Sequence, residues 1–274
     1  YGTSPACDAC GAPRDSWAHV LLHCAHPAVN GAVTNRHNAA LRAVYRGMET
    51  GRDARWLKLV NAGRMGGMRE QRTIPEWMCP GESEKPDMML LRGYPYTAPT
   101  PTGPLTEYDG RMVTVVLAEF TCTTERLIPE RERFKAEKYG PLVTRLRAEG
   151  WRVEPIVVVV AVGVRGGIPT SMQAALSLLG ICRDSDVRTV TENVLREVLW
   201  GNTRVMRAKR QADARMVRQR AADAARVEGR TAAERRDARM DVDHPPPAPP
   251  CLPREVGGGV GGGTAEARTG RPGD

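Results

Sequence analysis

The longest apolar run of the sequence, IVVVVAVGV from Ile156 to Val164, constrains the fold most strongly. Its length and β-branched composition are typical of a buried strand, whereas a membrane-spanning helix needs roughly 20 apolar residues. Two more strands are predicted by MVTVVLAEFT (Met112–Thr121) and by PDMMLL (Pro86–Leu91). RTIPEWM (Arg72–Met78) is a candidate edge strand, because its proline excludes a central position. We therefore expect an α/β fold with a small mixed sheet of about four strands flanked by helices.

Helical spacing occurs before and after the predicted strands. One helical face is formed by Leu41, Val44, Tyr45 and Met48, and Asn35 is a suitable N-cap for this helix. A second helical pattern follows Ile128, and Gly140 and Pro141 predict that it is kinked or divided into two helices. Further helices are predicted over Ser171–Leu179 and Asp186–Trp200, and a long basic helix follows them.

The end of the chain, from about Asp243, is rich first in proline and then in glycine. Such a tract cannot bury enough apolar surface to offset the entropy lost on ordering, so residues 241–274 are expected to be disordered. The 274 residues of the chain are enough for one or two domains. Because the sequence begins with Tyr1 rather than methionine, we expect it to be part of a longer protein.

Positive charge is concentrated in one part of the chain. The formal net charge is +8, and residues 201–240 alone contain twelve basic and five acidic side chains, a net charge of +7. A basic segment of this kind attracts a polyphosphate partner such as DNA or RNA. The alternative is a solvated helix of mixed charge that has no such partner.

Cysteine and histidine residues form a cluster near the N-terminus with the pattern C-x2-C-x8-H-x4-C, at Cys7, Cys10, His19 and Cys24. Three thiolates and one imidazole suit tetrahedral Zn²⁺, and a site closed by four protein ligands is structural rather than catalytic. His23 and His26 are competing ligands, and the alternative to a metal site is a pair of free thiols among scattered histidines. The seven cysteines fit a reducing, intracellular compartment better than a disulfide framework.

Two acidic residues are placed where they can hold a divalent ion. Asp87 precedes the predicted strand MMLL, and Glu119 lies within VTVVLAEFT, where an unpaired carboxylate is costly. Two carboxylates suffice for Mg²⁺, which in a nuclease neutralises the scissile phosphate and activates water. Lys135 or Lys138, three residues apart on the next helix, can stabilise the phosphate. The alternative is a simple turn at Asp87 and two ordinary solvated lysines.

The order of these motifs resembles the C-terminal part of non-LTR retrotransposon polyproteins. The match extends from about Cys7 to Gly180, and after the Cys/His cluster it consists of NRHN (Asn35–Asn38), KPDMMLL (Lys85–Leu91), VVLAEFT (Val115–Thr121), FKAEKYGPL (Phe134–Leu142) and GWRVEPIVVVVAVGVRGG (Gly150–Gly167). In this family, a CCHC zinc knuckle and a restriction-like endonuclease of the PD-(D/E)xK class follow the reverse transcriptase.

The resemblance implies a role for each matching residue. Asp87 and Glu119 match the two acidic metal ligands, although the family usually has aspartate at the second position. Lys135 or Lys138 matches the catalytic lysine, and the Cys/His cluster matches the ligands of the knuckle. The residues implied in contacts with nucleic acid are Arg36, His37 and Tyr139.

The resemblance also implies a function and a domain plan. The chain is expected to nick target DNA in the nucleus so that the 3′ end primes reverse transcription, with structural Zn²⁺ and catalytic Mg²⁺. Its expected partners are DNA, RNA and an upstream reverse transcriptase region of the same polyprotein. The expected parts are a zinc knuckle (1–33), an endonuclease domain (34–185), a helical basic extension (186–240) and the disordered tail.

Two other functions stay open at this point. The first is a catalytically decayed remnant that binds nucleic acid through the knuckle and the basic helix. Pro141 and the long proline-rich loop before the second acidic residue favour this alternative. The second is a zinc-bound structural module that has no role in nucleic-acid binding.

Overall fold

The computed structural model describes residues 6–62, 74–154 and 157–242, with side chains described up to residue 236. The chain divides into two compact units, residues 1–221 and residues 222–274. In the second unit the described residues continue helix α5 (Asp184–Val242), and the side chains from 222 to 236 are exposed. No helix in the described part of the chain is long and apolar enough to span a membrane. The expected disordered tail lies outside the described residues from residue 243 onward.

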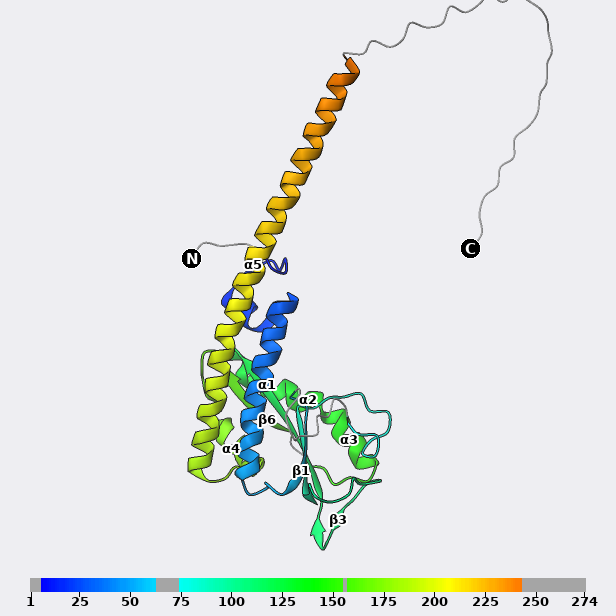
Figure 1. The fold of residues 1–274 in the computed structure, drawn as a ribbon. Helices are drawn as coiled ribbons and strands as arrows, with labels where there is room; N and C mark the ends of the chain where they lie inside the picture. Colours follow the sequence, from blue (N-terminus) through cyan, green and yellow to red (C-terminus); the bar gives the residue numbers. More distant parts are fainter. Residues whose placement is uncertain (1–5, 63–73, 155–156, 243–274) are drawn as a thin grey trace, which may run out of the picture. The chain divides into compact units, whose positions relative to one another are not determined.

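The first unit contains a mixed four-stranded sheet with helices, as the sequence predicts (Figure 1). The strands have the order β1-β2-β5-β6 and comprise β1 (Trp56–Val60), β2 (Met88–Pro95), β5 (Thr114–Thr123) and β6 (Val158–Gly163). β2 is antiparallel to β1 and β5, whereas β5 and β6 are parallel. The strands predicted after Asp87, around Glu119 and within the valine run are therefore confirmed. Ile156, at the start of that run, lies outside the described residues.

The fourth strand is not the one that the sequence predicted. Residues 74–78 form turns, and Arg72 lies outside the described residues. The edge of the sheet is instead β1, which reads WLKLV. The ammonium group of Lys58, in the middle of β1, donates hydrogen bonds to the carbonyl oxygens of Asp53, Ala54 and Trp56. These bonds allow a lysine to lie within an otherwise apolar strand.

A second, small sheet consists of β3 (Glu107–Tyr108) and β4 (Arg111–Met112), which pair as an antiparallel hairpin. Its two turn residues, Asp109 and Gly110, have φ values of 50° and 69°. Two consecutive positive φ angles are typical of a type I′ turn, whose twist matches that of the two strands of a hairpin. β3 lies within the long proline-rich loop of the sequence analysis, and β4 contains Met112, which was predicted to begin the following strand.

The helices differ from the prediction mainly in where they begin. α1 (Pro27–Thr50) is capped by His26, whose Nδ1 accepts a hydrogen bond from the N–H of Ala28, so Asn35 is not its N-cap. α1 therefore runs across the expected boundary between residues 33 and 34. The predicted division at Gly140 is confirmed, because α2 (Ile128–Lys138) ends there and α3 (Gly140–Ala148) begins. α4 (Ser171–Leu178) is also confirmed, and the two helices predicted after it are one helix, α5.

Both faces of the sheet are covered, so its strands are apolar on both sides. Val116, Ala118 and Phe120 of β5 face the cluster formed with α1, α4 and α5. Val115 and Leu117 face the opposite cluster, which includes α3 and Tyr139. Glu119 follows this second alternation and is therefore directed away from α1.

A buried carboxylate anchors the loop between α1 and β1. The Asp53 oxygens accept hydrogen bonds from Nε of Arg52 (3.2 Å) and Nε of Arg92 (3.0 Å). Burial by itself raises the pKa of Asp53, but the two guanidinium groups lower it below its ordinary value. Arg92 continues the network to Glu154 and to the carbonyl oxygen of Leu178.

Replacing Asp53 with asparagine should lower the free energy of unfolding by about 2 kcal/mol at neutral pH, because charge-assisted hydrogen bonds to two arginines are lost. The pKa of an aspartate in the unfolded chain is about 4. Because the pKa of Asp53 is lower in the folded protein, its carboxylate stabilises the fold at pH values above about 4. This stabilisation disappears as the pH falls through the pKa of the folded state. The stability difference between wild type and Asp53→Asn should therefore shrink below about pH 4. Urea unfolding across this pH range measures it, and a constant difference would contradict the assignment.

Candidate functional site

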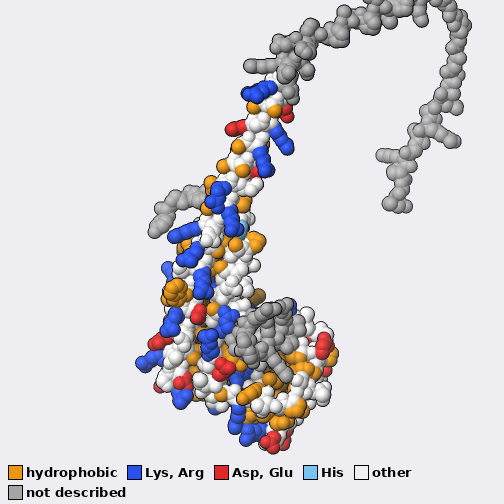
Figure 2. All heavy atoms as spheres, viewed as in Figure 1, with side chains coloured by type: hydrophobic (Ala, Val, Ile, Leu, Met, Phe, Trp, Pro, Cys, Tyr) orange, Lys and Arg blue, Asp and Glu red, His pale blue; other side chains and the backbone are white. Residues whose placement is uncertain are grey.

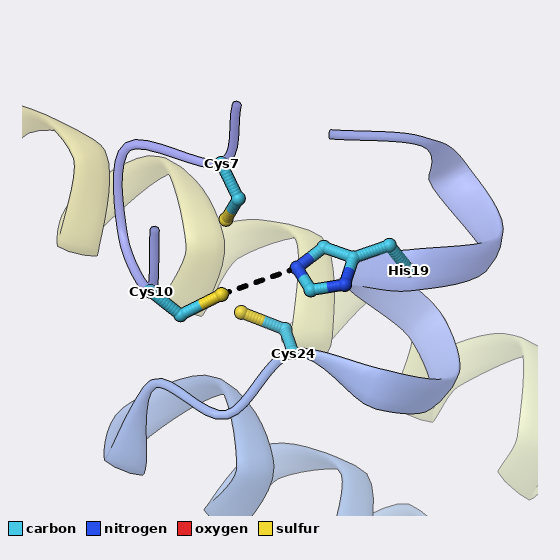
Figure 3. Close-up of side chains that lie close together, drawn as sticks. All are labelled: Cys7, Cys10, His19 and Cys24. Atoms are coloured by element: carbon cyan, nitrogen blue, oxygen red, sulfur yellow. Dashed lines mark hydrogen bonds between the residues drawn. The ribbon is translucent and has the colours of Figure 1, made fainter. Parts of the chain in front are cut away.

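The Cys/His cluster begins with a tight turn from Cys7 to Ala12. The N–H of Cys7 donates to the carbonyl oxygen of Ala12 (2.7 Å), and the N–H of Gly11 donates to that of Cys7 (2.7 Å). Gly11 has a φ of 76°, a conformation that favours glycine. This turn directs the sulfur atoms of Cys7 and Cys10 toward the same point (Figure 3).

The other two potential ligands come from the next segment. His19 begins a single π-helical turn, η1 (His19–His23), and Cys24 follows it directly. The four ligand atoms lie within 4.8 Å of one another, and Sγ of Cys10 is 3.3 Å from Nε2 of His19. Around a tetrahedral Zn²⁺ with Zn–S distances of about 2.3 Å, neighbouring ligand atoms are about 3.8 Å apart. The four residues could therefore hold a metal ion such as zinc, in a site closed by protein ligands.

The competing histidines do not belong to this group. His23 is exposed, and His26 uses its Nδ1 to cap α1. The convergence of three sulfur atoms on one imidazole also favours a metal site over a pair of free thiols. In the described residues, this is the one group of three or more histidine, cysteine or acidic side chains whose ligand atoms all lie close to one another.

The thiols of the cluster differ in acidity. Burial by itself raises the pKa of Cys10, but hydrogen bonds from the backbone N–H groups of Ala12 and Ala25 help to lower it to about 6. Burial raises the pKa of Cys24 to about 12. Binding of a metal ion requires thiolates, so loading of this site would release protons, chiefly from the more buried cysteines.

The cluster is attached to α5 by apolar and ionic contacts. Cys7 and Cys24 pack in one apolar cluster with Val205 and Ala212 of α5. The buried ammonium group of Lys209 lies 2.8 Å from Asp15 and 2.7 Å from Asp213. Arg220 and Asp8 add an exposed ion pair at 2.9 Å. Lys209 is one of the twelve basic residues counted in the basic segment, but it is buried and neutralised within the protein.

The second site is formed by Asp87, which directly precedes β2, and Glu119 of the neighbouring strand β5. Met88 of β2 pairs with Ala118 of β5, and the two acidic residues follow at the end of this ladder. The N–H of Asp87 donates to Oε1 of Glu119 (3.1 Å), and the N–H of Phe120 donates to Oδ2 of Asp87 (2.8 Å). Each carboxylate is thus held by the backbone of the partner strand.

The two candidate lysines have different surroundings. Nζ of Lys135 lies 2.7 Å from Oε2 of Glu119, so this lysine belongs to the carboxylate site. Nζ of Lys138 lies 3.1 Å from the hydroxyl oxygen of Tyr139 and 3.4 Å from Glu84. The geometry therefore connects Lys135 directly to the acidic pair, whereas Lys138 is connected through Tyr139.

The charges of the site affect each other's protonation. Burial by itself raises the pKa of Asp87, but the hydrogen bond with His37 and its charge lower it below the ordinary value. The pKa of Glu119 is raised by burial and by the charge of Asp87, against the opposing effect of Lys135. Asp87 is therefore the more acidic member of the pair. Two carboxylates and an ammonium group are groups that can bind a divalent cation and an adjacent phosphate.

His37 and Arg36 are neighbours on α1 but have different surroundings. Nε2 of His37 is 3.1 Å from Oδ2 of Asp87, so His37 is part of the carboxylate site. The Arg36 residue is 3% exposed, and its guanidinium donates to Oδ1 of Asn202 (2.6 Å) and to the carbonyl oxygen of Leu21 (2.9 Å). A buried guanidinium with these partners links α1, η1 and α5. The expected contact of Arg36 with nucleic acid is therefore replaced by a structural role.

Tyr139 is also buried, and its hydroxyl donates to the carbonyl oxygen of Lys85 at 3.3 Å. It therefore supports the segment that carries Asp87 and does not present a surface to nucleic acid. The partnership of His37 with Asp87 was missed, although the sequence contained a signal for it. His37 precedes Leu41 by four residues and Val44 by seven, a spacing that places it on the buried face of α1.

His19 and His23 offer a direct test of the metal centre. Replacing His19 with alanine should weaken Zn²⁺ binding by more than about 100-fold, because one of four ligands is lost. The matched variant His23→Ala removes an exposed imidazole at the other end of η1 and should leave the affinity unchanged. Competition with a chromogenic zinc chelator measures both affinities. Equal losses in the two variants would contradict the assignment of His19.

Comparison with known proteins assigns no family to this chain. The sequence matches no family model, and no curated protein matches it. The functional conclusion therefore depends on the chemistry of the two sites and on the resemblance in motif order.

Proposed function

We propose that the chain is a metal-dependent DNA endonuclease of the PD-(D/E)xK type with a restriction-like fold. The observation that carries this proposal is the convergence of Asp87, Glu119 and Lys135, which come from two strands and the helix that follows. Two acidic groups and a lysine are what such an enzyme uses to hold a divalent ion and to stabilise the phosphate. Asp87 and Glu119 are the residues that would hold Mg²⁺, which supplies charge neutralisation at the phosphate and activation of water.

The residues of the chain would orient the reacting groups. The backbone N–H groups of Phe120 and Asp87 fix one oxygen of each carboxylate, so both side chains are preorganised. The ammonium group of Lys135 balances the charge of Glu119 in the structure as it stands. In the complex with DNA, the same ammonium group would stabilise the negative charge of the scissile phosphate.

The biological setting is part of the proposal and rests on the order of motifs. The chain would belong to a retrotransposon polyprotein, act on DNA in the nucleus and follow a reverse transcriptase region. Its nick would supply the 3′ end that primes reverse transcription. The Cys/His cluster before the carboxylate site is the position at which such polyproteins carry their zinc knuckle.

Replacing Asp87 with asparagine should lower Mg²⁺-dependent nicking of supercoiled plasmid by more than about 100-fold, because the amide cannot bind the cation as a carboxylate does. The amide oxygen can still accept the hydrogen bond from Phe120, so the variant should stay folded. Asp109→Asn, at the exposed turn between β3 and β4, is the matched control and should nick normally. Undiminished nicking by Asp87→Asn would exclude this site as the catalytic centre.

Comparison of Lys135→Gln with Lys138→Gln should identify the catalytic lysine. Both variants remove one positive charge from α2, but only Lys135 contacts Glu119 directly. The Lys135 variant should lose about 100-fold or more in nicking rate, and the Lys138 variant less than about threefold. Single-turnover kinetics at saturating Mg²⁺ measures both rates. The opposite ranking would show that the contact with Glu119 is a structural ion pair.

A second candidate function is a decayed remnant that binds nucleic acid without cutting it. One observation favours it: both oxygens of Glu119 and Oδ2 of Asp87 already have partners within the protein. A carboxylate pair that has lost its cation could be held in this way by His37, Lys135 and the two backbone N–H groups. Wild-type protein that binds DNA in a salt-dependent manner, yet shows no nicking with any divalent ion, would support this alternative over the endonuclease.

A further inference from the structure

Within the first unit, helix α5 has two chemically different faces. One face is buried and consists of Gly201, Val205, Lys209 and Ala212. The other face carries five exposed arginines, which we call the arginine face: Arg204, Arg207, Arg210, Arg215 and Arg218. At 3.6 residues per turn, these five lie within an arc of about 140° around the helix. Figure 2 shows basic side chains gathered along α5.

The arginine face is not neutralised by acidic neighbours. Asp213, the acidic residue between Arg204 and Arg218, is held by Lys209 on the side of the Cys/His cluster. Among the residues whose side chains are described, none forms an ion pair with these five arginines. Other exposed arginines are paired, such as Arg133 with Glu137 and Arg183 with Asp186. Positive charge on this segment therefore lies on one face of the helix, and the acidic residue lies toward another.

The dimensions and composition of the arginine face fit a nucleic-acid backbone. From Arg204 to Arg218 the helix rises about 21 Å, the length of about six phosphates along one strand of B-DNA. No aromatic residue lies between these two positions in the sequence. Single-strand binders stack bases on aromatic side chains, whereas contacts to duplex DNA go largely to phosphates. The face is therefore better suited to duplex DNA than to unpaired bases.

The start of the arginine face is anchored to α1, the helix that contributes His37 to the carboxylate site. Asn202, two residues before Arg204, accepts a hydrogen bond from Arg36 and donates one to the carbonyl oxygen of Val164. Arg36 is followed directly by His37, which contacts Asp87. These hydrogen bonds fix the start of the arginine face relative to α1 and the end of β6.

From these observations, we propose that the arginine face of α5 binds the phosphate backbone of duplex DNA that flanks the carboxylate site. The proposal deepens the endonuclease function, since it names duplex DNA as the substrate class, but binding to this face needs neither Mg²⁺ nor Asp87. The contact is independent of base sequence, because arginines on an exposed helix face meet phosphates and no base edges.

The experiment compares two double variants that change the net charge equally. The face variant carries Arg207→Gln and Arg210→Gln and so lacks two members of the arginine face. The control variant carries Arg133→Gln and Arg183→Gln and so lacks two exposed arginines that form ion pairs. Fluorescence anisotropy measures binding of a labelled 20-base-pair duplex by zinc-loaded protein without Mg²⁺, from about 50 to 200 mM salt. Thermal unfolding verifies that both variants are folded.

The face variant should bind about tenfold or more weaker at the lowest salt, and its slope of log affinity against log salt should fall by about two, one unit for each lost phosphate contact. The control variant should keep the wild-type slope. Equal losses in both variants would mean that net charge alone attracts DNA and would overturn the proposal. Tighter binding of a single strand than of the duplex, or no duplex binding by wild type, would overturn it as well.

The outcome is separate from that of the nicking assay. The Asp87→Asn protein should show the wild-type salt slope, because Asp87 has no part in phosphate contacts made by α5. Duplex binding by a wild-type protein that shows no nicking would leave the arginine face assigned and would overturn the endonuclease. A face variant that binds duplex DNA weakly but still nicks it at high DNA concentrations would support both the arginine face and the endonuclease.

Discussion

The burial of Glu119 is the constraint on which the carboxylate site depends. Its side chain is 1% exposed, and it lies in β5, which has strand partners on both sides. An ionised carboxylate without partners costs several kcal/mol in such surroundings. The N–H of Asp87 and the ammonium group of Lys135 meet this requirement. These contacts also fix where β2 begins and which side of α2 faces the sheet.

The electrostatics of this arrangement favour a cation between the two acids. Burial and the negative charge of Asp87 raise the pKa of Glu119, whereas His37 lowers the pKa of Asp87 against the opposing effect of burial. Two carboxylates in close proximity cannot both ionise without mutual repulsion unless a positive charge lies between them. Lys135 supplies part of that charge to Glu119, and His37 supplies it to Asp87. The proposed Mg²⁺ would satisfy both acids with one ion.

Sequence reasoning succeeded where one physical effect dominates. The β-branched runs predict β5 and β6 because few other structures bury so many valines, and Pro141 predicts the division of α2 from α3 through its missing N–H. β1 could not be found in this way, since it has only five residues and Lys58 interrupts its apolar pattern. Its identity as a strand depends on pairing with β2, and burial of its lysine depends on carbonyl oxygens that the loop before it supplies.

Within the carboxylate site, the acidic residues and lysines could be chosen from the sequence because charged groups within or next to apolar strands are conspicuous. The choice between Lys135 and Lys138 could not be made, because both lie on one face of α2 and their different partners are set by tertiary contacts. The burial of Arg36 could not be predicted from the sequence, and the resemblance implied a contact with nucleic acid instead. Its burial depends on Asn202, which lies far away in the sequence.

The position of the Cys/His cluster explains why the two faces of α5 differ. Small cysteine-rich segments have little apolar surface of their own and fold with the help of a metal ion. Here the cluster packs on Val205 and Ala212 of α5, and Lys209 between them is neutralised by Asp15 and Asp213. A metal ion at the cluster would thus stabilise the helix that it packs against. The cluster occupies one side of α5, so the arginines on the other side stay free for a polyanion.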